Sequence, residues 1–163
     1  MNCPTCGAPL ALNPDKDYCR CDYCKGFYFP DRNEDGIRVF GTPAELKCPV
    51  CEVPLVHAAM GGVRFLYCGE CRGALAFMPI FADFVAEMRT QLGVRMSPLT
   101  PPDPTELDRR LTCPQCHNRM DTHRYGGPGN VIVDSCSKCD LIWLDHGELL
   151  RIIHAPDHTF QYE

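Results

Sequence analysis

The chain has 163 residues, thirteen of them cysteines, and a formal net charge of −5. No apolar run is long enough to cross a bilayer, which excludes a membrane-spanning helix and predicts a soluble protein. None of the segments 1–47, 48–97 and 98–163 is net positive, and this disfavours nucleic-acid binding, because phosphate contacts need a basic face.

Twelve cysteines form six Cys-x-x-Cys pairs, which fall in three consecutive groups of two pairs. This spacing suits tetrahedral thiolate ligation of a metal better than a disulfide framework. The first residues, MNCPTCGAPL, contain no recognisable export sequence, so we expect a reducing, cytoplasmic location. The pattern predicts a small metal-stabilised α+β protein of three tandem zinc ribbons, each an antiparallel hairpin or three-stranded sheet, with short appended helices.

The first ribbon is expected over residues 1–45. Residues 25–29 read as a short strand that ends at Pro30, and residues 37–40 read as a further strand. The predicted metal ligands of this ribbon are Cys3, Cys6, Cys21 and Cys24.

The second ribbon is expected over residues 46–96. Gly61-Gly62 predicts a hairpin between strands 55–60 and 63–67, and a third strand follows the last cysteine. An amphipathic helix is expected over 79–92, with Pro79 in its first turn. The predicted ligands are Cys48, Cys51, Cys68 and Cys71.

A proline-rich linker and a short helix are expected over 97–110. The linker is SPLTPPDP, and Asp103-Pro104-Thr105-Glu106 has the form of a capping box that opens a helix to about Arg110.

The third ribbon is expected over 111–163. It contains strands 120–125 and 131–135, a third strand over 141–144, and a C-terminal helix opened by the capping box Asp145-His146-Gly147-Glu148. The predicted ligands are Cys113, Cys116, Cys136 and Cys139.

The metal that best fits these groups is Zn²⁺, with iron in a rubredoxin-like site as the rival. Three such sites would bring the folded protein to a charge of about −11, since four thiolates around one divalent cation carry −2. A site closed by four thiolates leaves no position for water or substrate, so we expect three structural sites, no catalytic residues and no enzymatic activity. A ribbon of this size buries too little surface to fold unaided, so the metal-free protein should be largely unfolded.

The third ribbon resembles the zinc-ribbon family named after transcription factor IIB. The resemblance rests on Cys113-Pro-Gln-Cys116, on Cys136-Ser-Lys-Cys139 and on the segment Ile142-Trp-Leu-Asp-His-Gly-Glu-Leu149. His117 stands where the family has Gly, and Asp140-Leu141 where it has Gly-Gly; the second ribbon matches in its cysteines and hairpin, and the first in its cysteines alone. The resemblance implies zinc binding and a ribbon fold, whereas a link to transcription follows by analogy of fold only.

Several other residues have an ordinary structural role as their simplest interpretation. Cys19 is interpreted as a spare thiol, with a reactive thiol or an alternative ligand as the sharper hypotheses. His154 and His158 are four apart, but Pro156 between them disfavours a second metal site, and His117 is expected in a turn. Trp143 is predicted to be a hydrophobic plug of the third ribbon rather than a platform for bases.

The sequence favours a non-catalytic protein-interaction module or adaptor that docks on another protein through ribbon edges or helix 79–92. Ordinary packing of that helix onto the ribbons is the alternative to docking. The competing functions are nucleic-acid binding or transcriptional regulation, and a zinc- or redox-responsive switch.

Overall fold

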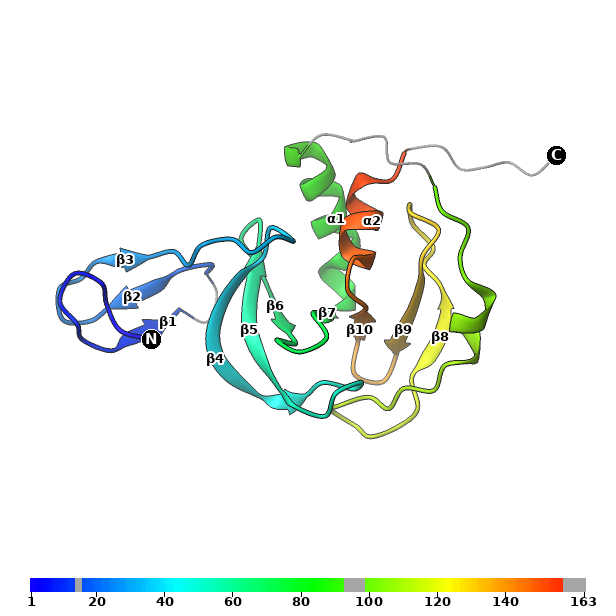
Figure 1. Ribbon diagram of the computed structural model, residues 1–163, viewed down its shortest axis with the longest axis horizontal. Helices are drawn as coiled ribbons and strands as arrows, with labels where there is room; N and C mark the ends of the chain where they lie inside the picture. Colours follow the sequence, from blue (N-terminus) through cyan, green and yellow to red (C-terminus); the bar gives the residue numbers. More distant parts are fainter. Residues whose placement is uncertain (14–15, 93–98, 157–163) are drawn as a thin grey trace.

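The computed structural model describes residues 1–13, 16–92 and 99–156. Figure 1 shows a small three-stranded sheet at one end and a larger, strongly curved sheet that carries two helices. Within the described ranges, no helix combines the length and apolar character needed to cross a membrane.

The small sheet has the order β1-β2-β3 and holds the first ribbon. Its strands are β1 (Leu10–Leu12), β2 (Cys19–Cys21) and β3 (Phe27–Tyr28). The pairing is antiparallel throughout, with Leu10 opposite Cys21 and Cys19 opposite Tyr28. This is the ribbon arrangement that the cysteine spacing predicts.

The large sheet has seven strands in the order β4-β5-β6-β7-β10-β9-β8, and all neighbouring pairs are antiparallel. Its strands are β4 (Arg38–Lys47), β5 (Pro54–Met60), β6 (Val63–Tyr67), β7 (Ala74–Phe77), β8 (Asp121–Arg124), β9 (Ile132–Cys136) and β10 (Leu141–Leu144). The expected hairpins of the second and third ribbons are therefore present.

The sequence predicts separate second and third ribbons, over 46–96 and 111–163. In the structure the two ribbons share one sheet. Their third strands, β7 and β10, pair along their whole length, with Leu75 opposite Trp143. Both side chains are buried, and so are Ala74 and Leu144 on the other face. A strand that is apolar on both faces and has an open edge gains burial by pairing with a similar strand, and this explains the fusion.

β4 also changes the expected boundaries, because it continues from the first ribbon to Lys47. It pairs with β5 in the large sheet through an irregular register, so residues 38–45 lie outside the ribbon to which the sequence assigned them. The two sheets meet at a cluster in which Cys19, Phe40 and Ala59 are buried. The Arg64 guanidinium lies 4.6 Å from the Phe40 ring centroid and donates to the Asn13 carbonyl at 3.0 Å.

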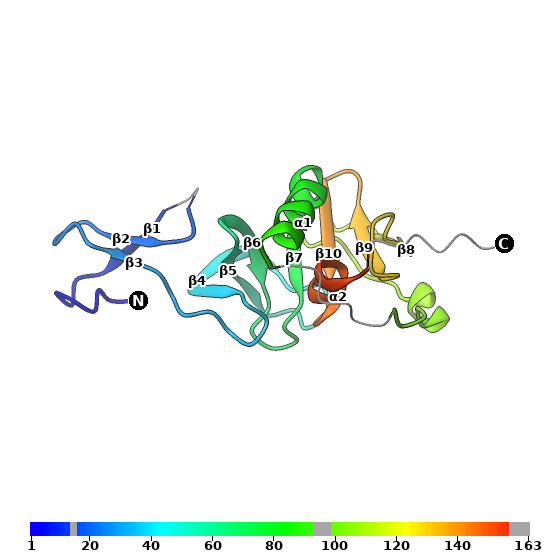
Figure 2. The same cartoon turned by 90° about the horizontal axis from the view of Figure 1, so that it is seen from above.

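Two helices cover one face of the large sheet, as Figures 1 and 2 show. α1 (Met78–Leu92) is one residue longer than predicted and buries Phe81, Phe84, Val85 and Met88 against the sheet. α2 (Glu148–His154) lies beside it, and Arg89 of α1 donates to the Ile152 carbonyl at 2.9 Å. The apolar face of α1 is therefore part of the core, in agreement with the alternative that this helix packs onto the ribbons.

Both predicted capping boxes form only in part. The linker carries a 3-10 helix, η1 (Pro104–Asp108), in place of a helix to Arg110, and Asp103 caps it by accepting from the Thr105 amide at 2.9 Å. At α2, Glu148 accepts from the Asp145 amide at 2.7 Å, but the helix begins after Gly147 without a side-chain cap. The Asp145 carboxylate instead accepts from Trp143 Nε1 at 3.1 Å and pairs with Arg109.

Candidate metal centres and sheet groove

The structure brings the twelve paired cysteines together in the three groups that the sequence predicts. In each group the four sulfurs lie within 4.8 Å of one another. The groups are Cys3, Cys6, Cys21 and Cys24; Cys48, Cys51, Cys68 and Cys71; and Cys113, Cys116, Cys136 and Cys139.

The distances between sulfurs fit a tetrahedral zinc site. Zn–S bonds of about 2.3 Å place the ligand sulfurs about 3.8 Å apart. The Sγ–Sγ distance is 3.7 Å for Cys3–Cys24 in the first group. It is 3.6 Å for Cys48–Cys71 in the second group and for Cys116–Cys136 in the third. These groups thus have the size and donor set of closed four-thiolate sites.

Each cysteine pair lies on the same tight turn. The residue after the second cysteine has positive φ in all six turns, and in four of them its amide donates to the carbonyl of the first cysteine. Turns with positive φ favour glycine, but only Gly7 is a glycine. The six residues are Gly7, Lys25, Glu52, Arg72, His117 and Asp140. Turn hydrogen bonds hold three of the five side-chain-bearing residues, Glu52, Arg72 and His117, in a conformation that side chains rarely adopt.

Backbone amides of the turns point at the sulfurs and favour the thiolate form. The Val50 and Cys51 amides donate to Cys48 Sγ at 3.4 and 3.3 Å. At Cys3, the amides of Cys6 and Thr5 lower the pKa of the thiol to about 6, and at Cys116 the Asn118 amide lowers the pKa to about 6. Burial and the neighbouring thiols raise the pKa of Cys6 and of Cys139 to about 12, so the amides favour the thiolate form at some cysteines of a group and not at others.

The three sites differ in their exposure to solvent. In the first site Cys6 and Cys24 are exposed, whereas the second and third sites contain only buried and half-buried cysteines. The latter two sites also share one apolar cluster, which includes Leu75 and Trp143. The first site depends on its own small sheet, and the other two depend on one common core.

Cys19 and the histidines form no further metal site in the described part of the chain. Cys19 is buried on β2, and burial raises the pKa of its thiol, which opposes the reactive-thiolate hypothesis. His117 lies in a turn, as expected. His154 ends α2, whereas its predicted neighbour His158 lies outside the described residues.

The side chain of Trp143 is fully buried, as predicted for a plug, but it serves two ribbons. Its ring lies against Gly73 of the second ribbon, at the junction of β7 and β10. The sequence predicts a role in the third ribbon alone, because neither strand contains a sequence pattern that identifies the pairing of β7 with β10.

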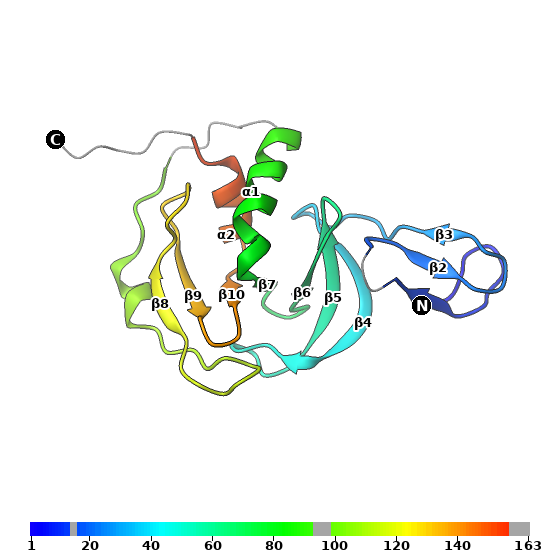
Figure 3. The same ribbon diagram turned by 180° about the vertical axis from the view of Figure 1, so that it is seen from behind.

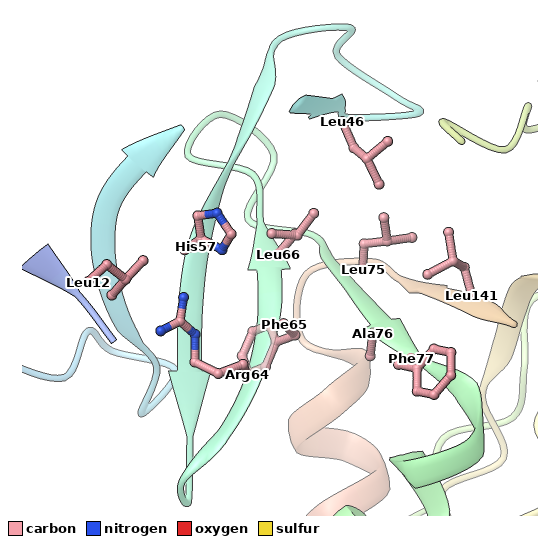
Figure 4. Close-up of a pocket in the computed structure, with 10 residues that line it drawn as sticks. All are labelled: Leu12, Leu46, His57, Arg64, Phe65, Leu66, Leu75, Ala76, Phe77 and Leu141. Atoms are coloured by element: carbon pink, nitrogen blue, oxygen red, sulfur yellow. The ribbon is translucent and has the colours of Figure 1, made fainter. Parts of the chain in front are cut away.

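A groove on the large sheet is the feature that sequence reasoning missed. β6 and β7 pair only at Leu66–Leu75 and Tyr67–Ala74, and beyond this point the strands separate. A cavity of about 490 Å³ lies there, and Figure 4 shows the side chains around it. Its lining is mainly apolar and consists of Leu12, Leu46, His57, Arg64, Phe65, Leu66, Leu75, Ala76, Phe77 and Leu141.

The groove is open to solvent and has little polar character. Phe77 is 47% exposed at its rim, and Leu46, Leu66 and Leu141 are half-buried. Burial lowers the pKa of His57, so its imidazole is neutral near pH 7. The groove therefore offers mainly apolar contact surface, and Arg64 is the charged residue in its lining.

Comparison with known proteins supports the zinc assignment for the third ribbon. Residues 112–155 match the model of the TFIIB-type zinc-ribbon family, described as a transcription factor zinc-finger. No curated protein and no solved structure matches the chain. The matched segment is similar to that family, and with the sulfur geometry of all three groups it identifies the protein as a zinc-binding chain of tandem ribbons.

Proposed function

We propose that this protein is a non-catalytic interaction module that binds an extended apolar segment of a partner protein in the groove between β6 and β7. The groove carries the proposal. Its volume of about 490 Å³ falls in the range of about 300–1,000 Å³ that is common for ligand sites.

The separated strands suit an extended peptide better than a compact molecule. Where neighbouring strands part, their backbone groups are no longer used between them, and an inserted peptide can pair with them while its side chains enter the cavity. Leu66, Leu75 and Leu141 supply the apolar surface for such side chains. The position of Phe77 at the rim gives the site an aromatic contact of the kind that is enriched at binding hot spots.

The metal centres support a structural role for zinc and a reducing, cytoplasmic location. Four thiolates around each ion leave no open coordination position for substrate, which favours the non-catalytic function over metal-dependent catalysis. Twelve of the thirteen cysteines stand in these metal groups, and thiolate sites of this kind suit a reducing compartment.

The family description names transcription factors, so nucleic-acid binding is the competing function. The charge of −5, and about −11 with three zinc ions, disfavours it, because phosphate contacts supply most of the affinity for nucleic acid.

A peptide selection on the zinc-loaded chain tests the proposal. Peptides are selected from a random display library, and their affinities for the wild type, Phe77→Asp and Phe27→Asp are compared. Phe27 is an exposed aromatic residue of the first ribbon and serves as the control. We expect apolar peptides whose affinity falls at least about tenfold with Phe77→Asp and is unchanged with Phe27→Asp.

Two results would contradict the groove as the binding site. One is equal affinity of the selected peptides for both variants, and the other is the absence of any selected peptide. A gel-shift series at low and at physiological salt tests the competing function, since a non-specific nucleic-acid binder must bind at low salt.

A further inference from the structure

The second and third ribbons are related by a local two-fold axis within one chain. Leu75 is the fourth residue after Cys71, Trp143 is the fourth residue after Cys139, and the two lie opposite each other. On either side of this pair, Ala74 faces Leu144 and Ala76 faces Ile142. Each strand leads into a helix, and the two helices touch. Equivalent residues thus meet at the centre, as in an isologous dimer interface.

The first ribbon contains the same third strand. Its residue after the last cysteine, Lys25, has φ 62°, and the equivalent Arg72 has φ 61°. The Cys21 amide donates to the Gly26 carbonyl at 2.8 Å, as the Cys68 amide does to Gly73 at 2.9 Å. By these matches Tyr28, the fourth residue after Cys24, is equivalent to Leu75 and Trp143.

In the described part of the chain β3 has a partner on one side only. It pairs with β2 and forms the outer edge of the small sheet, far from the two helices in Figure 3. Phe27 on this strand is 63% exposed, and Phe29, which follows the strand, is 49% exposed. An exposed, apolar edge strand is a template for pairing with another chain.

The backbone of this edge is suited to pairing. Gly26 directs its carbonyl to β2, so by the alternation of an antiparallel strand the backbone groups of Tyr28 also face β2, and those of Phe27 and of the following Phe29 face outward. Pro30, which lacks an N–H group, lies beyond the last residue of β3, and its carbonyl accepts from the Arg38 guanidinium, so it removes no donor from the paired segment.

We propose that β3 pairs with β3 of a second copy of this chain, in the register of β7 and β10. Tyr28 then lies opposite its own copy on the two-fold axis, and Phe27 lies opposite Phe29 of the partner subunit. The result is a six-stranded sheet shared by two subunits. This interface does not depend on the groove, and it gives the first ribbon the edge partner that the other two ribbons supply to each other.

The mass of the zinc-loaded full chain in solution tests the proposal. Sedimentation should give twice the chain mass of 18.3 kDa, with a concentration-dependent return to the monomer. A concentration series in which the wild type remains a monomer throughout would overturn the inference.

Two double variants test the register. In Phe27→Lys/Phe29→Glu each Lys faces a Glu of the partner subunit, whereas in Phe27→Lys/Phe29→Lys each Lys faces a Lys. Opposite charges directly across a sheet stabilise the pairing and like charges destabilise it. We expect the dissociation constant of the like-charged variant to be at least about tenfold higher than that of the mixed-charge variant.

Both double variants alter the same two exposed side chains, but the Arg38 guanidinium lies 5.7 Å from the Phe29 ring centroid, so folding of each variant is checked separately. Three zinc ions per chain in both variants verify that the ribbons are folded. Equal dissociation constants for the two variants would refute the register, and dissociation by Phe77→Asp alone would assign the interface to the groove instead.

Discussion

The indole of Trp143 lies directly against Gly73, on the residue that precedes β7 of the other ribbon. A Cβ atom added to Gly73 would lie 2.2 Å from Trp143 Cζ2 and 2.7 Å from Cη2. Gly73 is buried and has no positive φ, so its lack of a side chain serves packing rather than backbone conformation. The junction between the second and third ribbons therefore requires a glycine at this position.

We predict that Gly73→Ala destabilises the large sheet by about 1–3 kcal/mol, because a rigid ring has to shift in a packed core. Gly69→Ala is the matched control, since Gly69 is exposed and a Cβ there meets nothing within 4 Å. Denaturant unfolding of the zinc-loaded variants, followed by the fluorescence of Trp143, measures both changes. Equal midpoints for the two variants would contradict the close packing.

The metal sites should differ in what their loss does to the rest of the chain. Cys21→Ser removes a ligand of the small sheet, so we expect two remaining zinc ions per chain and unchanged Trp143 emission. Cys136→Ser removes a ligand from the cluster that contains Trp143, so we expect red-shifted emission and weaker zinc binding at the second site as well. Elemental analysis and emission spectra check both results. Identical spectra for the two variants would contradict the shared core.

Oxidation should release zinc from the first site before the others. Hydrogen peroxide oxidises accessible thiolates and is itself reduced to water, and Cys6 and Cys24 are the exposed ligands. We expect a fast phase of one zinc ion per chain in a chelator assay, which is missing in Cys21→Ser. Simultaneous release of all three ions, or earlier oxidation of Cys51 and Cys71, would rule out this order and weaken the redox-switch hypothesis.

Glu148 should make the protein less stable as the pH rises. It is buried at the start of α2, and burial raises its pKa from 4.5 to about 8. Between these values the folded state binds the proton and the unfolded state does not, so the free energy of unfolding falls with pH, by at most about 1.4 kcal/mol per unit.

Glu148→Gln should remove this slope and be more stable than the wild type above about pH 8, since its amide oxygen can still accept from the Asp145 amide. Comparing the two proteins at each pH cancels the titration of the zinc ligands, which both share. Glu87→Gln, an exposed carboxylate of α1, is the control. Parallel stability curves for Glu148→Gln and the wild type would show that Glu148 is ionised in the fold.

The sequence contains the metal sites but not the arrangement of the ribbons. Cysteine spacing is a local signal, so all three ligand groups could be predicted. The pairing of Leu75 with Trp143 could not, because it joins residues 68 positions apart through two short apolar strands that carry no mark of their partner. Because this pairing could not be predicted, the apolar face of α1 suggested a docking helix. The sheet that buries Phe81 and Phe84 exists only once the ribbons have joined.

Arg109, Asp134 and Asp145 form a polar network in the third ribbon. Arg109, which follows η1, pairs with the Asp145 carboxylate and lies 3.9 Å from that of Asp134, which is 3% exposed. Burial already raises the pKa of Asp134, and Thr122 is its hydrogen-bonding neighbour on β8.

Arg109→Met leaves the buried Asp134 carboxylate without its cation, and we expect a loss of about 1–3 kcal/mol, below the range for fully buried pairs because Arg109 is partly exposed. Adding Asp134→Asn should restore part of this loss, because the amide carries no charge. Arg110→Met is the matched control, since its exposed side chain donates to the neighbouring Arg109 carbonyl and makes no ion pair within the described residues. Denaturant unfolding of the wild type, Arg109→Met, Asp134→Asn and the double variant forms a double-mutant cycle. If the losses of unfolding free energy in the two single variants simply add in the double variant, then Arg109 acts through Asp145 alone and Asp134 is neutral in the folded chain.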